Sequence, residues 1–391
     1  MSESAVIVGA GQGGLQAAAS LRQEGFDGTI TLIGAEPGLP YQRPPLSKAY
    51  LKTGIADGLR LRPESFFVKN AISYFPDTEV EQIDRENRRV MAGDATFTYD
   101  HLILATGSRN LRPPIEGLDR AIDLRTLADA ERLRAALDRP MRCAVIGGGF
   151  IGLEFAAVAR GLGHDVVLAE AAPRLMARAV SPQMSERFLE KHMSLGCRII
   201  LNQAVTSVSE AAIHLADGSE HPANLVLLAA GIRPNTELAA AAGLSVANGI
   251  VTDATLRTAD PAISALGDCA AFPDPRTGRM IRLESVQAAT DHARTIARRI
   301  VHGSAEPYAA VPWFWSDQAD WKLQIAGLAA PSDTSMAAEG DAILRFDDDI
   351  LTAVETVNDP KRHMKARRLF AQTPAPTRGM LAEVDFDLAR L

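Results

Sequence analysis

A glycine-rich turn between an apolar run and a helical segment constrains this 391-residue chain more than any other feature. The apolar run spans residues 5–8, and the turn places Gly9, Gly11 and Gly14 in the spacing G-x-G-x-x-G. Glu36 ends the next apolar run, at about the ~20-residue distance expected for an acid that binds a ribose. This arrangement predicts a βαβ unit that binds a dinucleotide, with the pyrophosphate at the N-terminus of the helix.

The same pattern occurs a second time further along the chain. Residues 143–146 form an apolar run, Gly147, Gly149 and Gly152 repeat the glycine spacing, and Glu170 ends the following apolar run. One glycine-rich turn is weak evidence, because such turns are common. Two copies with their acids predict two dinucleotides on one chain.

The acid of the second copy also bears on the choice of cofactor. A carboxylate at Glu170 accepts a ribose 2′-hydroxyl but repels a 2′-phosphate, which favours NADH over NADPH. Arg174 and Arg178 follow closely and could neutralise a phosphate, so the strictness of this preference stays open. We expect NADH to be the preferred nucleotide at the second turn.

Charge and cysteine content narrow the class of protein. A net charge of −7 argues against general nucleic-acid binding, and no uninterrupted apolar run reaches the ~18 residues of a membrane span. The three cysteines, Cys143, Cys197 and Cys269, form no Cys-x-x-Cys pair, which favours small buried residues over a redox role. We therefore expect a cytoplasmic protein of two or three domains without a metal site, contacting neither nucleic acid nor membrane.

A proline-rich segment at 40–48, Pro-Tyr-Gln-Arg-Pro-Pro-Leu-Ser-Lys, follows the first turn. With that turn it resembles the FAD-dependent, NADH-using ferredoxin reductases that serve bacterial cytochrome P450 and ring-hydroxylating oxygenase systems. Further motifs occur in the order of that family: Ala-Thr-Gly at 105–107, Gly-Ile-Arg-Pro-Asn at 231–235, Leu-Gly-Asp at 266–268 and Glu-Ser-Val-Gln at 284–287. The resemblance covers most of the chain, from Val6 to about Gly327.

The resemblance implies an α/β fold with two Rossmann-like nucleotide-binding domains of the glutathione-reductase type and a small C-terminal α+β domain. The FAD-binding domain is expected in two pieces, residues 1–109 and 232–310. The NADH-binding domain is expected at 110–231, and the C-terminal domain at 311–391.

The resemblance also implies which residues act on the reacting rings. Lys48 of the Leu-Ser-Lys motif is expected to pair with Glu154 beside flavin N5 and the nicotinamide. Trp315 is expected over or beside the isoalloxazine ring, and Trp313 in the core. Lys48, Glu154 and Trp315 are therefore the predicted catalytic residues. An acid in the first turn of a helix is also stabilised by the helix dipole, so a structural role for Glu154 stays open.

Cofactor binding is expected from both glycine turns, their acids and the family motifs. The helix that opens after residue 285 would present N–H donors and its dipole to the flavin pyrimidine edge. The predicted cofactor-binding residues are Gly9, Gly11, Gly13, Gly14, Glu36, Arg43, Lys48, Val80, Ala105, Thr106, Gly107, Arg125, Gly147, Gly149, Phe150, Ile151, Gly152, Glu154, Glu170, Arg178, Gly231, Gly267, Asp268, Glu284, Ser285, Val286 and Trp315.

Two nucleotides on one chain predict hydride transfer from NADH to FAD. Disulfide reductases of the same fold family place a Cys-x-x-x-x-Cys or Cys-x-x-Cys pair beside the flavin, and this sequence has neither. It also lacks the four clustered cysteines of an iron–sulfur centre. We therefore interpret the chain as an FAD-dependent NADH:ferredoxin oxidoreductase whose [2Fe–2S] ferredoxin is a separate molecule.

Basic residues suggest where an acidic ferredoxin docks. Arg294 and Arg298 lie one helical turn apart, and Arg299 is adjacent. Ordinary solvated surface charge is the alternative interpretation. A second basic cluster lies nearer the C-terminus: Lys361, Arg362, Lys365, Arg367 and Arg368.

Two other functions remain open at this point. An NADH oxidase-type flavoenzyme would consume oxygen rapidly without any ferredoxin. A non-enzymatic NADH/FAD redox sensor would keep its flavin reduced for minutes with every ferredoxin tried.

Overall fold

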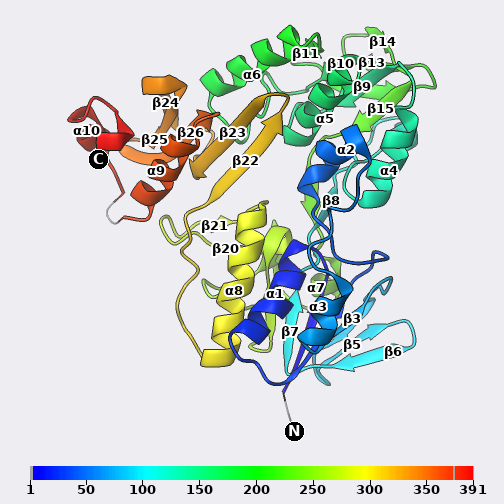
Figure 1. The fold of residues 1–391 in the computed structure, drawn as a ribbon, viewed down its shortest axis with the longest axis vertical. Helices are drawn as coiled ribbons and strands as arrows, with labels where there is room; N and C mark the ends of the chain where they lie inside the picture. The colour runs from blue at the N-terminus through cyan, green and yellow to red at the C-terminus, as the bar shows by residue number, and fades with distance from the viewer. Residues whose placement is uncertain (1–2, 373–374, 391) are drawn as a thin grey trace. The chain divides into compact units, whose positions relative to one another are not determined.

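The computed structural model describes residues 3–372 and 375–390 (Figure 1). Residues 1–2 and 391, at the outer limits of the predicted domains, lie outside the described part, as do 373–374. The chain forms two compact units, each assembled from three segments. Unit 1 comprises Met1–Gln42, Asp57–Arg109 and Arg233–Ala310. Unit 2 comprises Arg43–Ala56, Asn110–Ile232 and Val311–Leu391.

Unit 1 is built around a parallel five-stranded sheet in the order β19-β7-β1-β2-β3. The central strand β1 (Ser4–Val8) pairs with β2 (Thr29–Ile33) on one side and β7 (His101–Leu104) on the other. β3 (Ile72–Phe75) and β19 (Ile263–Ala265) form the edges. The apolar side chains of β1 are buried, as expected for a parallel strand covered on both faces.

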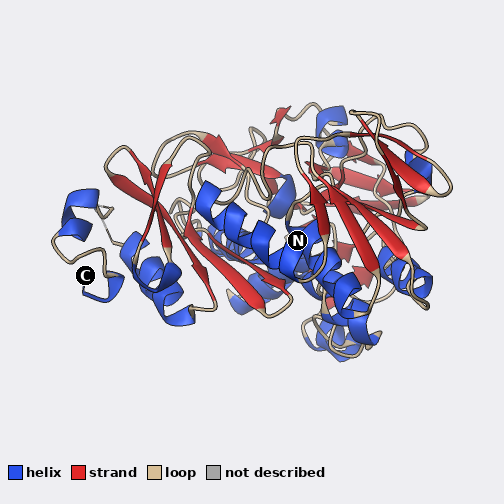
Figure 2. Ribbon diagram, turned by 90° about the horizontal axis from the view of Figure 1, so that it is seen from above, coloured by secondary structure: helices blue, strands red, loops and turns tan. Residues whose placement is uncertain are grey.

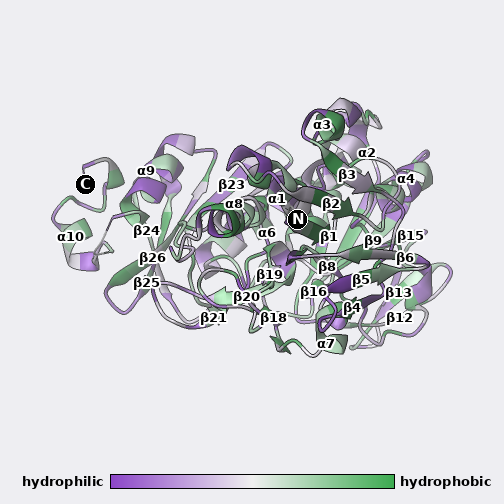
Figure 3. Ribbon diagram, turned by 90° about the horizontal axis from the view of Figure 1, so that it is seen from below, coloured by the Kyte–Doolittle hydropathy of each residue, from purple (hydrophilic) through white to green (hydrophobic). Residues whose placement is uncertain are grey.

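Helices cover one face of this sheet. α1 (Gln12–Gln23) and α8 (Val286–His302) pack against each other, and their apolar side chains share a core with the central strands. Figure 3 shows the hydrophobic colour of β1 and β2 inside this arrangement. A second core, on the other side of the central strands, joins them to two small sheets in the orders β4-β5-β6 and β17-β18-β20-β21.

The other elements of unit 1 are short. β8 (Ser108–Asn110) and β16 (Ile232–Pro234) each include residues assigned to both units. The rest are α3 (Glu64–Lys69), β4 (Gln82–Asp84), β5 (Arg89–Ala92), β6 (Ala95–Thr98), α7 (Glu237–Ala241), β17 (Val246–Ala247), β18 (Gly249–Val251), η3 (Gly267–Cys269), β20 (Ala270–Pro273) and β21 (Met280–Ile281).

Unit 2 repeats the parallel arrangement in a four-stranded sheet of order β11-β10-β9-β15. β9 (Arg142–Ile146) pairs with β10 (Asp165–Ala169) and β15 (Leu225–Leu228), and β11 (Arg198–Ile200) lies at one edge. One face of the sheet packs against an antiparallel sheet of order β12-β13-β14. The further elements of this part are η1 (Pro44–Ser47), α2 (Ala49–Thr53), η2 (Leu118–Arg120), α4 (Leu127–Ala136), α5 (Phe150–Gly161), α6 (Pro182–Ser194), β12 (Val205–Val208), β13 (Ala212–Leu215) and β14 (Glu220–Pro222).

The C-terminal part of unit 2 is an antiparallel sheet of order β22-β23-β26-β25-β24. α9 (Pro360–Phe370) packs on β23 and β26, and Figure 2 shows helices near the C-terminus beside these strands. β22 also packs against α5, which connects this sheet to the parallel part of the same unit. The elements are β22 (Trp313–Gln318), β23 (Trp321–Gly327), β24 (Thr334–Ala337), η4 (Glu339–Asp341), β25 (Ile343–Asp347), β26 (Ile350–Val357), α10 (Arg378–Ala382) and η5 (Leu388–Arg390).

This architecture confirms the predicted fold class of two Rossmann-like sheets and a C-terminal α+β part. The compact units group residues 110–232 with 311–391 and 43–56, and the boundaries between three domains stay a prediction. In the described ranges, no helix combines the length and the apolar character needed to cross a membrane.

Candidate functional site

The first glycine turn joins β1 to α1 in unit 1. Gly9 has a φ of +107°, a conformation that L side chains rarely adopt, and a Cβ there would overlap the Ala105 carbonyl oxygen. A Cβ on Gly14 would overlap the Gly9 carbonyl oxygen, so α1 lies very close to the turn. Gly11 is the N-cap of α1, and among the described residues a Cβ there would meet nothing within 4 Å. The turn therefore leaves free N–H donors beside open space, which fits a dinucleotide pyrophosphate.

The second turn, in unit 2, has nearly the same geometry. Gly147 has a φ of +106°, and a Cβ there would overlap the Ala229 carbonyl oxygen. A Cβ on Gly152 would overlap the Gly147 carbonyl oxygen. Gly149 caps α5 and faces open space in the described structure, as Gly11 does in the first turn. The residues at this turn therefore fit a second dinucleotide.

The acids that follow the two turns are held by different partners. Glu36 accepts a hydrogen bond from the hydroxyl of Tyr41, which is buried in unit 1. Glu170 accepts hydrogen bonds from the backbone N–H groups of Gly148, at 2.6 Å, and Ala172, at 2.7 Å. Glu170 is thus held against its own glycine turn through Gly148, whereas Glu36 is held by a side chain outside the first turn.

The two arginines after Glu170 have different surroundings. Arg174 donates to the carbonyl oxygens of Val180, at 2.8 Å, and Ala177, at 2.6 Å, inside its own loop. Burial lowers its pKa from the usual value, and the neighbouring Arg345 charge lowers it further. Arg178 is exposed. Arg178 is therefore better placed than Arg174 to meet a nucleotide phosphate.

Polar contacts inside unit 1 organise the predicted flavin-binding loops. The Thr106 hydroxyl donates to the Asn235 carbonyl oxygen at 2.7 Å, and the Asn235 amide donates to the Thr106 carbonyl oxygen at 2.8 Å. The Ser108 hydroxyl donates to the Asp268 carboxylate at 2.7 Å. Ser285 caps α8, its hydroxyl accepting from the backbone N–H of Ala288 at 3.0 Å. The contacts of Thr106 with Asn235 and of Ser108 with Asp268 join chain segments that lie far apart in the sequence.

Lys48 and Glu154 come together inside unit 2. The Lys48 ammonium lies 3.1 Å from Glu154 Oε1 and 3.5 Å from the Asp317 carboxylate. Glu154 is 4 % exposed and Lys48 17 % exposed. Glu154 also accepts hydrogen bonds from the hydroxyls of Ser47, at 2.5 Å, and Ser316, at 2.7 Å. Glu154 lies beyond the first turn of α5, so the sequence-based placement in that turn is wrong and the helix dipole does not explain this acid.

Two opposing effects act on the pKa of Glu154. Burial raises it, because the charged form loses its solvation. The charge of Lys48 and the hydrogen bonds from Ser47 and Ser316 oppose that increase. The net direction is upward.

An aromatic side chain, Trp315, lies near this ion pair within unit 2. The Lys48 ammonium lies 6.0 Å from the centre of the Trp315 ring, which is half-buried. The Trp313 ring lies 5.5 Å from Trp315 and carries the Arg367 guanidinium at 4.5 Å. Trp313 is half-buried, so the prediction that it lies in the core is wrong. It lies on β22, the edge strand of the sheet, where its ring stays partly exposed to solvent.

The predicted site residues divide between the units. Those in unit 1 are Gly9, Gly11, Gly13, Gly14, Glu36, Val80, Ala105, Thr106, Gly107, Gly267, Asp268, Glu284, Ser285 and Val286. Those in unit 2 are Arg43, Lys48, Arg125, Gly147, Gly149, Phe150, Ile151, Gly152, Glu154, Glu170, Arg178, Gly231 and Trp315. Within unit 2 the Arg43 guanidinium donates to the Arg125 carbonyl oxygen at 2.5 Å, so these two residues also meet.

Sequence reasoning missed four residues that hold the predicted ones. Ser47, Ser316, Tyr41 and Ser108 donate to Glu154, Glu36 or Asp268. Ser47 lies inside the Leu-Ser-Lys motif, which is a signal that could have found it. Ser108 and Ser316 carry no local signal, because their partners lie 160 and 162 positions away.

The predicted docking arginines differ in exposure. Arg294 and Arg298 are exposed on α8, and Arg294 pairs with Asp291 at 3.0 Å. Arg299 is half-buried and donates to the Ser264 hydroxyl, and burial lowers its pKa to about 10. Arg299 is therefore held inside unit 1, on another side of the helix.

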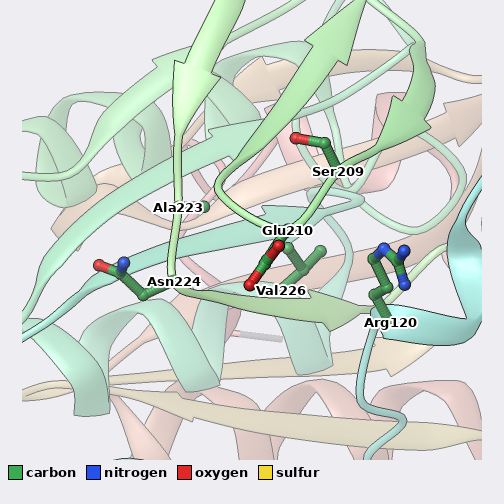
Figure 4. A pocket seen from close by; sticks show the side chains of 6 residues that line it. All are labelled: Arg120, Ser209, Glu210, Ala223, Asn224 and Val226. Carbon is green, nitrogen blue, oxygen red and sulfur yellow. The ribbon is translucent and has the colours of Figure 1, made fainter.

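A hollow of about 370 Å³ on the surface of unit 2 lies apart from the predicted residues (Figure 4). None of the side chains that line it was predicted to bind a cofactor: Arg120, Ser209, Glu210, Ala223, Asn224 and Val226. The described residues also include no group of three or more His, Cys, Asp or Glu side chains arranged to hold a metal ion.

Comparisons with known proteins agree with this geometry. Residues 3–293 match the family described as pyridine nucleotide-disulphide oxidoreductase, and residues 313–391 match the reductase C-terminal family. Rhodocoxin reductase of Rhodococcus erythropolis is 46 % identical over 98 % of this chain and 93 % of its own length. The chain belongs to the pyridine nucleotide-disulphide oxidoreductase family and carries the reductase C-terminal domain.

Solved structures are similar over the same length. The ferredoxin reductase for the CYP199A2 system from Rhodopseudomonas palustris has a TM-score of 0.95 and 42 % identity, with 99 % of each chain covered. The covalent putidaredoxin reductase–putidaredoxin complex has a TM-score of 0.94 and 34 % identity, covering 99 % of this chain and 97 % of that chain. The predictions of an oxidoreductase with FAD and NAD(H) as cofactors are confirmed.

Proposed function

We propose that this chain is an NADH-dependent flavoprotein ferredoxin reductase that passes electrons from NADH through FAD to a [2Fe–2S] ferredoxin. The ferredoxin would serve a cytochrome P450 or a ring-hydroxylating oxygenase. The observation that carries this proposal is similarity to ferredoxin reductases over nearly the whole chain, including the C-terminal sheet. The absence of a closely spaced cysteine pair from the sequence supports an external acceptor instead of a disulfide.

The two nucleotides are assigned to different units. FAD is held by the first turn, with Glu36 on its ribose and Asp268 and Ser285 at its flavin end. NADH is held by the second turn, with Glu170 on its adenine ribose. When bound, FAD accepts two electrons from NADH as a hydride and releases them singly to one-electron carriers.

Lys48, Glu154 and Trp315 are assigned to the reacting ends of these nucleotides. Lys48 supplies a fixed positive charge, and Glu154 holds its ammonium in place. Trp315 supplies a flat apolar surface next to that charge. A preorganised cation stabilises negative charge more effectively in a water-poor site than in solvent.

NADH is proposed as the preferred donor because Glu170 repels a 2′-phosphate and Arg174 is held inside its own loop. A cytoplasmic location is also proposed, supported by three buried cysteines that are free in the described structure. The three-domain division is retained as a proposal. Arg294 and Arg298 are proposed to dock the acidic ferredoxin, whereas Arg299 is left out because it is held by Ser264.

The test is steady-state NADH oxidation by the purified FAD-loaded protein in air, with and without a [2Fe–2S] ferredoxin. We expect the ferredoxin to stimulate cytochrome c reduction strongly, with little oxygen uptake in its absence. Rapid NADH loss that ignores the ferredoxin would indicate an NADH oxidase. A flavin that stays reduced with every acceptor would indicate a redox sensor.

Charge reversal at Arg294 and Arg298 tests the docking proposal. We expect slower ferredoxin turnover with unchanged reduction of a small dye, because the dye does not need the basic surface. Reversal at the exposed pair Arg257 and Arg279, elsewhere in unit 1, is the control. Equal ferredoxin kinetics in all variants would contradict the docking proposal.

A further inference from the structure

A chain of hydrogen bonds leads from Glu154 into the interior of unit 2. The Ser316 hydroxyl donates to Glu154 Oε1 at 2.7 Å, and the Gln318 side-chain amide donates to the Ser316 hydroxyl at 3.1 Å. His192 Nε2 lies 2.8 Å from Gln318 Oε1. All four side chains are at most 4 % exposed. These hydrogen bonds therefore connect Glu154, the proposed catalytic acid, to His192, which has no proposed role in cofactor binding.

The fold accounts for this placement. Side chains on a strand alternate between faces, so Ser316 and Gln318 lie on the same face of β22. His192 lies near the end of α6. Two contacts hold α6 there: Lys191 lies 2.7 Å from Asp320 in the turn after β22, and Phe188 packs edge-to-face on Trp321, the first residue of β23. The helix and the strand are thus packed so that His192 reaches Gln318.

The donors in the chain all point the same way. Gln318 uses its N–H on Ser316, so its carbonyl oxygen faces His192 and requires an N–H at His192 Nε2. The other ring nitrogen, Nδ1, lies 4.0 Å from the Cys197 sulfur, whose S–H can donate to it. Burial lowers the pKa of His192, which favours the neutral ring that carries one proton. The Ser316 hydroxyl receives the Gln318 N–H and directs its own proton to Glu154.

The charges around Glu154 explain why this donor matters. Lys48, the residue that follows η1, is the cation next to Glu154. The Lys48 ammonium also lies close to the Asp317 carboxylate of β22. Lys322 of β23 lies 4.0 Å from Asp317. Ser47 and Ser316 are the hydroxyl donors that the described structure gives the carboxylate. Removing a donor from a buried carboxylate favours its protonated form.

We propose that Gln318 and His192 are positioning residues that fix the Ser316 hydroxyl as a donor to Glu154 and so hold this carboxylate, ionised, toward Lys48. The inference rests on the proposed function, in which Lys48 and Glu154 serve electron transfer from NADH to FAD. It adds two residues that touch neither nucleotide. In this series of hydrogen bonds, the N–H of His192 sets the orientation of the Gln318 amide, and the amide in turn sets the direction of the Ser316 hydroxyl.

The first test is the rate of flavin reduction by NADH in the FAD-loaded enzyme, measured without oxygen by stopped flow as a function of pH. Protonation of Glu154 should slow the reaction as the pH falls. Gln318→Leu and His192→Phe remove the amide and the imidazole, and should move the midpoint upward by about one pH unit. His192→Gln retains an N–H donor and should restore most of the wild-type profile.

The control for general loss of packing is Thr356→Val. Thr356 is buried on β26 in the same sheet, and its hydroxyl donates to the Gln324 carbonyl oxygen at 3.3 Å, outside the chain to Glu154. This change removes one hydrogen bond with little change in shape, so the midpoint should stay where it is in the wild type. An unchanged midpoint in Gln318→Leu and His192→Phe would overturn the proposal, even if both variants are less stable.

A second readout does not depend on turnover. The infrared carbonyl band of a protonated Glu154, assigned by its loss in Glu154→Gln, should appear at higher pH in Ser316→Ala and Gln318→Leu than in wild type. If the band shifts in Ser316→Ala but not in Gln318→Leu, Ser316 acts on Glu154 without help from the residues behind it. That result would overturn the roles of Gln318 and His192. If wild type is not reduced by NADH, the proposed function fails, while this band still decides the inference. If Gln318→Leu does not retain FAD, the comparison of His192→Phe with His192→Gln decides it.

Discussion

The two glycine turns share a backbone but differ in how their acids are held. Gly9 and Gly147 have φ values of +107° and +106°, and in each unit the helix lies so close to its turn that a Cβ on Gly14 or Gly152 would overlap a carbonyl oxygen. Glu36, however, is held by the Tyr41 side chain, whereas Glu170 is held by two backbone N–H groups. The glycine spacing thus determines the backbone conformation of the turn, while the hydrogen bonds that hold each carboxylate come from residues outside the three glycines. We expect a substitution in either turn to impair binding of the nucleotide at that turn. We expect the two acids to differ in how easily a single substitution disturbs them.

The largest effect is expected from Gly9→Ala and Gly147→Ala. Positive φ costs an L residue about 1–2 kcal/mol, and each new Cβ would also overlap a carbonyl oxygen. Gly9→Ala should yield protein with little bound FAD, whereas Gly147→Ala should keep its FAD but lose reduction by NADH. The flavin-to-protein absorbance ratio and the NADH reduction rate measure these effects. Loss of FAD from Gly147→Ala would contradict the assignment of one nucleotide to each unit.

The next largest effect is expected from acid acting on unit 1, because this unit contains the fully buried His292. Its Nδ1 accepts from the backbone N–H of Gly267 at 3.2 Å, and burial lowers its pKa from 6.5 to about 3. Below pH 6.5 the unfolded chain binds a proton that the folded chain does not, so stability falls as the pH falls from about 6.5 toward 3.

At about pH 5 this loss amounts to about 2 kcal/mol. His292→Gln does not titrate, so its denaturation midpoint should change less than that of wild type between about pH 7 and pH 5. Flavin fluorescence, which reports release of FAD from unit 1, follows the transition. An identical acid response in both proteins would show that His292 does not carry the effect.

Glu170→Ala should have a smaller effect, confined to the second nucleotide. Without the carboxylate, the preference for NADH over NADPH in kcat/KM should fall about tenfold, because the repulsion of a 2′-phosphate is lost. Glu36→Ala is the matched control: it should weaken FAD retention and leave the NADH/NADPH ratio unchanged. A ratio that shifts in both variants would mean that the two acids do not serve separate nucleotides.

The smallest effect should come from Tyr41→Phe. Loss of the hydroxyl donor to Glu36 is expected to weaken FAD binding by about 1 kcal/mol, or a few-fold in Kd. No comparable single substitution releases Glu170, because its donors belong to the backbone. Titration of the apoprotein with FAD measures the change. An unchanged Kd would show that Tyr41 does not orient Glu36 for the ribose.

The comparison also shows how far the sequence alone predicts this molecule. Both turns follow from short-range spacing, because strand, turn and helix are contiguous. The pairing of Lys48 with Glu154 is predicted by the family resemblance alone, because the two residues are far apart in the sequence. The roles of Ser316 and His192 do not follow from the sequence, because Ser316 meets Glu154 from 162 positions away and His192 meets Gln318 from 126 positions away.

Helix geometry explains why Arg299 has different surroundings from Arg294 and Arg298. Adjacency in sequence suggested that it joins Arg294 and Arg298 at the surface. Residues four apart share a helix face, whereas the next residue is turned by about 100°. That turn directs Arg299 toward Ser264. Arg294 and Arg298 are therefore the exposed members of the three arginines predicted to dock a ferredoxin.

The most direct test of the central claim is a two-step mixing experiment without oxygen. The FAD-loaded protein is first reduced with one equivalent of NADH and then mixed with oxidised [2Fe–2S] ferredoxin. We expect the flavin to be reoxidised while two ferredoxin molecules are reduced for each NADH, because one hydride carries two electrons. A flavin that stays reduced while the ferredoxin stays oxidised would contradict it.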